Sequence, residues 1–227
     1  MIKIFSDGAD LKSMLSIKDK VQGYTTNPSL MKKAGVVNYE LFAKEVLSHI
    51  KDLPISFEVL SDDLNEMELQ ARRIASWGNN VYVKIPITNT KGESTSTIIK
   101  RLSDDGIKVN VTAILTRSQV KIAFNSLSNK TPAIISVFAG RISDAGHDAQ
   151  LIMRWSSYII HKKSNIELLW ASTREIYNIK QAKECGCDII TVTPEMLNKM
   201  PMMNKDLTEL SLDTVKMFFE DSRGLVL

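Results

Sequence analysis

Short apolar runs rich in β-branched and aromatic residues recur along the whole chain and alternate with amphipathic segments. Runs of this kind are typical of buried strands. We predict eight strands, at Ile2–Phe5, Val21–Tyr24, Ile55–Val59, Val81–Ile85, Ile107–Val111, Ala133–Val137, Ile166–Trp170 and Asp188–Val192. The segments between them carry apolar residues at three- and four-residue spacing, which predicts helices with one buried face. These helices are expected at Tyr39–Lys51, Leu64–Trp77, Ser94–Ser103, Ser118–Leu127, Ala149–His161 and Arg174–Cys185.

The alternation of strand and helix predicts a parallel sheet built from βαβ units. Eight such units in 227 residues suit an α/β fold consisting of a single (β/α)8 TIM barrel. A doubly wound open sheet is the main alternative, but the Gly-rich phosphate loop usual after its early strand is absent. No linker or low-complexity tract divides the chain. We therefore expect one domain over residues 1–227, with a C-terminal helical segment at about residues 205–222.

Charge and hydropathy limit the partners of the chain. A net charge of +3, with basic residues scattered along the predicted helices, argues against nucleic-acid binding. No apolar run approaches the roughly 20 residues of a membrane span, and the N-terminus leads directly into a strand. We therefore expect a cytoplasmic protein with no membrane partner. Cys185 and Cys187 are too close together for a sound disulfide, and no further cluster of Cys or His completes a metal site.

Lys84 interrupts the apolar strand predicted at Val81–Ile85. Burial deprives an ammonium group of hydration and so favours the neutral amine. A neutral amine on a rigid strand is a nucleophile for carbonyl carbon, which is how Schiff-base enzymes begin their reactions. The alternative is a lysine whose ammonium reaches solvent or pairs with a carboxylate. The strand alone leaves both interpretations open.

Polar residues follow strand after strand at the carboxyl end, where a barrel of this type places its active site. They include an aspartate, a glutamate, a lysine and two arginines. We predict that they converge on one site, made of Asp7, Thr25, Asn27, Glu58, Lys84, Asn110, Thr112, Ser136, Phe138, Arg141, Ser172 and Arg174.

Five segments resemble motifs of the transaldolase family, in the same order and at comparable spacing. Gly23–Leu30 is similar to the signature G-x-T-T-N-P-S-[LI], and Tyr82–Pro86 resembles the strand that carries the Schiff-base lysine. The other three are Asn110–Thr112, Phe138–Ile142 and Ala171–Arg174. The resemblance covers about residues 2–197, and the chain length matches the short branch of the family, which contains fructose-6-phosphate aldolases and compact transaldolases. The sequence Ser6-Asp7-Gly8 departs from the Leu-Asp-Thr usual there.

The resemblance implies an enzyme of carbohydrate metabolism that uses no metal and no organic cofactor. Such enzymes transfer a dihydroxyacetone unit from a ketose phosphate to an aldose phosphate, so sugar phosphates are the expected substrates. Lys84 is implied as the Schiff-base residue and Asp7 as the group that moves the proton of the C4 hydroxyl. Glu58 and Thr112 are implied to hold a water for proton transfer.

The other candidates are implied to contact the substrate. Asn27, Asn110 and Ser172 are expected at the dihydroxyacetone hydroxyls, and Arg141 and Arg174 at the phosphate. Thr25, Ser136 and Phe138 complete the expected binding set.

Other roles remain open for several of these residues when they are considered one by one. Asp7 could cap a helix, although Asp10 suits that cap better. Glu58 could be only an ion-pair partner of Lys84, and both arginines could form ordinary surface ion pairs.

Three activities are compatible with the sequence. Fructose-6-phosphate aldolases of the family tend to have Gln, Tyr and Gly where this chain has Glu58, Phe138 and Asn110, so these positions favour a transaldolase. An aldolase that releases dihydroxyacetone is the alternative, and a catalytically silent barrel that binds sugar phosphates is a third hypothesis.

The predicted C-terminal helix carries many apolar residues between Leu207 and Phe219. This surface could pack on a neighbouring subunit, as in the short branch, or cap its own barrel. A homo-oligomer is expected.

Overall fold

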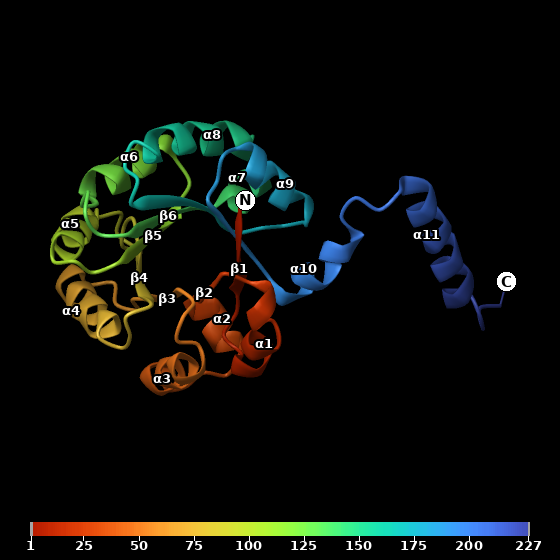
Figure 1. The fold of residues 1–227 in the computed structure, drawn as a ribbon, viewed down its shortest axis with the longest axis horizontal. Coiled ribbons are helices and arrows are strands. Elements are labelled where there is room, and N and C mark those ends of the chain that lie inside the picture. Colours follow the sequence, from red (N-terminus) through yellow and green to blue (C-terminus); the bar gives the residue numbers. More distant parts are fainter. Residues whose placement is uncertain (1, 227) are drawn as a thin grey trace.

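A closed barrel of eight parallel strands forms the centre of the computed structural model, which describes residues 2–226 (Figure 1). Strands that follow one another in the sequence are neighbours in the barrel, and β8 pairs with β1 to close it. The structure confirms the predicted (β/α)8 barrel and excludes the open sheet. The strands are β1 (Lys3–Asp7), β2 (Gly23–Thr25), β3 (Ile55–Glu58), β4 (Val81–Pro86), β5 (Val109–Ile114), β6 (Ala133–Val137), β7 (Ile166–Trp170) and β8 (Ile189–Val192).

Helices link successive strands and form a ring around the barrel (Figure 1). They are α1 (Leu11–Ser16), α2 (Pro28–Lys33), α3 (Tyr39–His49), α4 (Leu64–Ala75), α5 (Ser96–Asp104), α6 (Arg117–Ser126), α7 (Ala139–Asp144), α8 (Ala149–Ile160), α9 (Tyr177–Glu184), α10 (Pro194–Lys199) and α11 (Leu207–Asp221), with short 3-10 turns at Lys18–Lys20 and Met200–Met202. Asp10 caps α1, where its side chain accepts a hydrogen bond from Ser13 N. Asp7 lies in β1 and does not cap this helix.

Side chains alternate along each strand between the helix layer and the barrel interior. On β4, Val83 and Ile85 belong to the large apolar cluster under the helices, whereas Tyr82 packs against a second cluster. That second cluster fills the interior of the barrel with Phe5, Ile134, Leu169, Ala171 and Ile189. Lys84 is two residues beyond Tyr82 on the same face of β4, so its side chain enters the barrel above this apolar floor.

The predicted elements differ from the observed ones at their ends, and the short helices α2, α7 and α10 have no predicted counterpart. β5 begins at Val109 instead of Ile107, because Ile107 N donates to Leu102 O and closes the end of α5, with Gly106 at a φ of +83°. α9 begins at Tyr177 instead of Arg174, because the amides of Arg174 and Glu175 both donate to the side chain of Asn178 and form a turn before the helix.

The C-terminal helix α11 lies within the predicted range and stands apart from the barrel (Figure 1). None of its residues is buried, and the side chains of Leu212, Val215, Phe218 and Phe219 are exposed. The alternative in which this helix caps its own barrel is therefore wrong for this structure. Within residues 2–226, no helix is both long and apolar enough to cross a membrane.

Candidate active site

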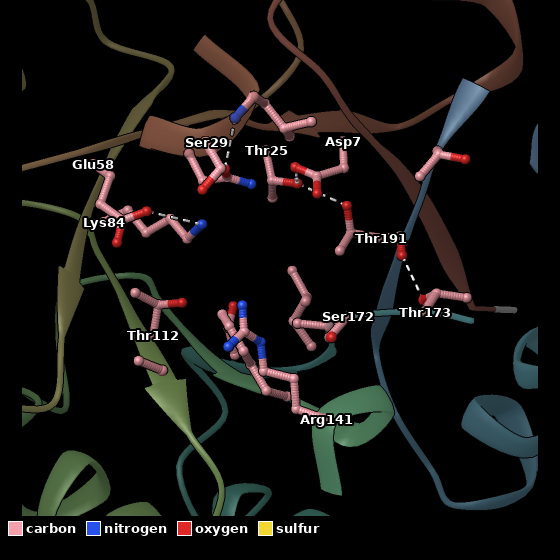
Figure 2. Close-up of a pocket in the computed structure, with 18 of the residues that line it drawn as sticks. Asp7, Thr25, Ser29, Glu58, Lys84, Thr112, Arg141, Ser172, Thr173 and Thr191 are labelled. Carbon is pink, nitrogen blue, oxygen red and sulfur yellow. Dashed lines mark hydrogen bonds and ion pairs between the residues drawn. The ribbon is translucent and has the colours of Figure 1, made fainter. Parts of the chain in front are cut away.

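A cavity of about 510 Å³ opens where the strands end (Figure 2). Its walls contain every predicted site residue except Asn110: Asp7, Thr25, Asn27, Glu58, Lys84, Thr112, Ser136, Phe138, Arg141, Ser172 and Arg174. These residues come from seven of the eight strands or from the segments that follow them. The predicted convergence of polar strand ends therefore occurs, at the end of the barrel where enzymes of this fold hold their substrates.

Lys84 and Glu58 face each other across adjacent strands. The register of β3 and β4 pairs the two residues directly, and Lys84 Nζ lies 3.2 Å from Glu58 Oε2. Lys84 Nζ also donates to Thr26 O at 3.0 Å, and the residue is only 6% exposed. Lys84 is thus both buried and paired with a carboxylate. In this resting arrangement the amine must lose a proton before it can act as a nucleophile.

Asp7 lines the cavity from β1, next to Thr25 of β2 (Figure 2). Its register partner on β2 is Thr25, whose Oγ1 donates to Asp7 Oδ1 at 3.0 Å. Burial raises the pKa of Asp7, and the positive charge of Lys84 and the bond from Thr25 oppose that rise only in part. A carboxyl group with a raised pKa is suited to take up a proton and to return it within one reaction cycle.

Thr112 carries a polar atom that protein groups leave unpaired. Its Oγ1 is buried and has no hydrogen-bond partner among the described residues. The next residue, Ala113, has a φ of +58°, and the pairing of β5 with β6 is irregular between Val111 and Ile114. Backbone strain of this kind is common at functional sites. A buried hydroxyl without a partner is suited to bind a molecule in the cavity.

Asn110 lies outside the cavity lining, although it comes from the same strand as Thr112. Its Nδ2 donates to Ser56 Oγ at 2.9 Å, and its Oδ1 accepts from Ser136 Oγ at 2.6 Å. The residue is fully buried, whereas Ser136 lines the cavity. In this arrangement Asn110 holds Ser136 in place. Its own contact with a substrate stays a prediction that requires these bonds to rearrange.

The side chain of Asn27 caps a helix and also lines the cavity. Its Oδ1 caps α2 by accepting from Leu30 N at 3.0 Å, which fixes the orientation of the amide. The amide nitrogen keeps its donors for the cavity, which Asn27 lines together with Pro28 and Ser29.

The two arginines of the site differ in their surroundings. Arg141, in α7, lies with its guanidinium 5.6 Å from the centre of the Phe138 ring and extends toward the cavity (Figure 2). Arg174 forms a bidentate pair with Asp144, with Nε at 3.0 Å and Nη2 at 2.5 Å from Oδ2. This pair raises the pKa of Arg174 and lowers the pKa of Asp144. The ion pairing left open by the sequence therefore occurs at Arg174.

Close packing between α7 and the segment after β7 brings these arginines to the same side of the cavity. Gly140 makes this contact possible, because a Cβ at this position would lie 1.6 Å from Ser172 O. Ser172 itself has a φ of +64°, a conformation that few residues with a side chain adopt. This close packing brings the segment of Ser172 and Arg174 next to α7, which carries Arg141.

Sequence reasoning missed four polar residues of the lining: Ser29, Thr173, Thr191 and Thr193. Thr191 could have been predicted from the sequence, because the alternation along β8 puts it on the same face as the interior residue Ile189. Thr173 donates to Thr191 O at 2.6 Å, a contact between segments that no local pattern contains. Within the described part of the chain, no group of three or more His, Cys, Asp or Glu residues is placed to hold a metal ion.

The family model for transaldolase and fructose-6-phosphate aldolase matches residues 4–226. The chain belongs to this family. Relatives named as probable transaldolases include one from Dehalococcoides mccartyi, 34% identical over 92% of this chain and 93% of the relative. Another, from Streptococcus equi subsp. equi, is 36% identical over 97% of both chains. Membership of the transaldolase family makes the protein an enzyme with a transaldolase-like function.

A solved structure from Burkholderia cenocepacia, assigned provisionally to the phosphonomutases, matches with a TM-score of 0.57 over 97% of this chain and 94% of the other. Only 10% of the aligned residues are identical, so this likeness concerns the barrel fold alone.

Proposed function

We propose that this transaldolase-family enzyme moves a dihydroxyacetone unit from a ketose phosphate to an aldose phosphate through a Schiff base on Lys84. The observation that carries the proposal is the buried Lys84, which lines the cavity with Glu58 beside it and Asp7 in the same lining. These groups provide a nucleophile and two proton carriers within one cavity.

In the proposed reaction, Lys84 transfers a proton to Glu58 or to a water bound at Thr112, and its amine attacks the C2 carbonyl of the donor. The carbinolamine then loses water and becomes an iminium ion. Asp7 removes the proton of the C4 hydroxyl while the C3–C4 bond breaks, and the electron pair of that bond enters the iminium to form an enamine. The aldose phosphate leaves. Addition of the enamine to an acceptor aldehyde reverses these steps, and Asp7 returns its proton to the new hydroxyl.

The polar residues of the cavity fit the two ends of such a donor. Asn27 and Ser172 offer hydrogen bonds to the dihydroxyacetone hydroxyls, and Arg141 and Arg174 offer charged donors to the phosphate. An unmatched polar group in a buried site is costly, so these contacts would also select the substrate.

Replacing Arg174 by Ala is expected to raise KM for phosphorylated donors by about 10- to 150-fold, since a charge-assisted contact of this kind contributes roughly 1.5–3 kcal/mol. The KM for dihydroxyacetone as donor should change little, because dihydroxyacetone carries no phosphate. Steady-state kinetics with both donors measure the difference. Arg154→Ala is a matched control, since Arg154 lies on α8 outside the cavity lining. Equal losses with both donors would assign Arg174 to the scaffold.

Transfer and cleavage differ in the fate of the enamine. Release of free dihydroxyacetone requires protonation of the enamine carbon, whereas transfer requires the enamine to survive until an acceptor binds. Glu58 is held as the ion-pair partner of Lys84, and Phe138 has no hydroxyl with which to position a protonating water. Both residues favour transfer over release.

The direct test is incubation with fructose 6-phosphate, with and without an aldose phosphate acceptor, while transfer product and free dihydroxyacetone are both measured. We expect transfer to exceed release in the unmodified enzyme. The double change Glu58→Gln and Phe138→Tyr should raise the ratio of release to transfer by about fivefold per position, from roughly 1 kcal/mol for each altered hydrogen bond. Release as fast as transfer in the unmodified enzyme would favour the aldolase activity instead. Absence of both reactions would favour a barrel that only binds sugar phosphates.

We also propose that the enzyme is a homo-oligomer in which α11 packs on a second copy of the chain. Support comes from the exposed apolar side chains of Leu212, Val215, Phe218 and Phe219 on a helix that buries none of its residues in its own barrel. Light scattering of the purified protein tests this proposal, and a monomer at micromolar concentration would contradict it.

A further inference from the structure

Three inward-facing side chains on neighbouring strands form a hydrogen-bonded chain that ends on Asp7. Thr25 Oγ1 lies 3.0 Å from Asp7 Oδ1 and 2.7 Å from Thr191 Oγ1, and the three residues come from β1, β2 and β8 (Figure 2). Thr25 and Thr191 are 3% and 6% exposed, and both line the cavity. In a place of this kind a hydrogen bond is electrostatically stronger than in water.

Counting hydrogens fixes the direction of this chain. The hydroxyl of Thr25 carries one hydrogen, and it donates that hydrogen to the carboxylate of Asp7. Thr25 can then only accept from Thr191, so Thr191 must be the donor of the 2.7 Å bond. Both hydroxyls point their hydrogens toward Asp7 as long as that group is ionised.

Protonation of Asp7 on Oδ1 reverses the direction: the carboxyl then donates to Thr25, Thr25 donates to Thr191, and the hydrogen of Thr191 is left to the cavity that Thr191 lines. Protonation on Oδ2 leaves the direction unchanged and removes the charge toward which both hydroxyls point. Among the described residues the Thr191 hydroxyl bonds only to Thr25, and the side chains beneath it, Phe5 and Ile189, are apolar. With Asp7 ionised, both hydroxyls have partners and their dipoles point toward the carboxylate charge, which favours the ionised form.

The backbone holds Thr191 in this position. Thr191 O accepts from Thr173 Oγ1 at 2.6 Å, which ties the end of β8 to the segment after β7. On the other side, the Phe5 ring fills the space next to Gly23, where a Cβ would lie 2.5 Å from the ring. The 2.6 Å bond fixes the backbone of Thr191, and the ring packs against the backbone two residues before Thr25.

We propose that Thr191 is a positioning residue that acts through Thr25 and keeps Asp7 in the ionised, proton-accepting form at the start of the reaction. The catalytic part of this inference rests on the proposed function, because Asp7 must act on the donor hydroxyl for the effect to reach the rate. Two charged groups act on Asp7 from other strands: Lys84 favours its ionised form and Glu58 opposes it. Neither is altered by a change at Thr191.

The test is a titration of the Asp7 carboxyl, followed by carbon-13 NMR in protein labelled at the aspartate carboxyls, with Asp7→Asn to assign the signal. In Thr191→Val the titration midpoint should rise by a few tenths of a pH unit, to about half a unit at most, because the carboxylate loses the dipole of one hydroxyl that points toward it. Thr191→Ser keeps the hydroxyl and should titrate as the parent does, and Thr191→Ala replaces the Val variant if that variant folds poorly. An unchanged or lower midpoint in Thr191→Val, or an equal rise in Thr191→Ser, would overturn the proposal.

The pH dependence of kcat/KM separates this inference from the proposed function. If both are correct, the acid limb of the profile moves upward in Thr191→Val in step with the NMR midpoint. A shift in the NMR midpoint without a matching shift in the acid limb would support the effect of Thr191 on Asp7. It would refute the role of Asp7 in the reaction.

Discussion

Substitution of Lys84 by Met is expected to lower transfer of the dihydroxyacetone unit by on the order of 10⁴-fold or more, as for removal of other covalent nucleophiles. The physical reason is the loss of the amine that turns the donor carbonyl into an electron sink. Without an iminium, the electron pair of the C3–C4 bond has no acceptor of comparable strength. Initial rates with fructose 6-phosphate and an aldose phosphate acceptor measure the effect.

A charge-retaining variant separates chemistry from electrostatics. Lys84→Arg keeps a cation beside Glu58, so the ion pair at the cavity wall persists. Its guanidinium stays protonated in proteins and cannot attack a carbonyl. We expect this variant to be as inactive as Lys84→Met. Activity within tenfold of the parent in Lys84→Arg would mean that Lys84 acts only through its charge, and the Schiff-base mechanism would be wrong.

Substitution of Asp7 by Asn is expected to lower the rate of transfer by about 10²- to 10⁴-fold, the usual contribution of a general acid–base group. The amide has nearly the same shape as the carboxyl and can still accept the bond from Thr25 through its oxygen. It cannot take the proton of the C4 hydroxyl. Adduct formation at Lys84 should persist in this variant, because Asp7 acts after the iminium has formed.

The same variant should be more stable than the parent at neutral pH. The pKa of Asp7 is raised in the folded protein above its ordinary value of 3.8, mainly by burial, so the folded state holds this proton more tightly than the unfolded state does. Between the two pKa values the contribution of Asp7 to stability falls as pH rises, and above the folded-state pKa the ionised group disfavours folding. Asn has no such group. The stability gain should therefore be largest at neutral pH and vanish as pH falls toward 3.8, which urea unfolding across this range can measure. A gain that grows toward acid pH would contradict the assigned direction.

The amino-acid sequence predicted the barrel and most of the cavity because both follow from local patterns. Apolar runs marked the strands, and Lys84 stood out as a lysine inside one of them. Because parallel strands end at the same rim of a barrel, the polar residues after each run had to meet there. Asp7, Glu58 and Lys84 were found in this way.

The site contacts that the sequence did not predict join segments that are distant in sequence. Arg174 pairs with Asp144 only because Gly140 lets α7 approach the segment at Ser172. Asn110 looked like a ligand, but Ser56 of β3 and Ser136 of β6 occupy both ends of its amide. Which groups share a hydrogen bond depends on side-chain geometry across the barrel, and periodicity along one strand does not contain that geometry.

The most direct test of the central claim is reductive trapping with borohydride in the presence of fructose 6-phosphate, followed by mass spectrometry of the intact protein and its peptides. The proposed mechanism predicts one reduced, sugar-derived adduct per chain, located on Lys84, and none in Lys84→Arg. An adduct on another lysine, or no adduct with any of several ketose phosphates, would contradict a Schiff base at this site.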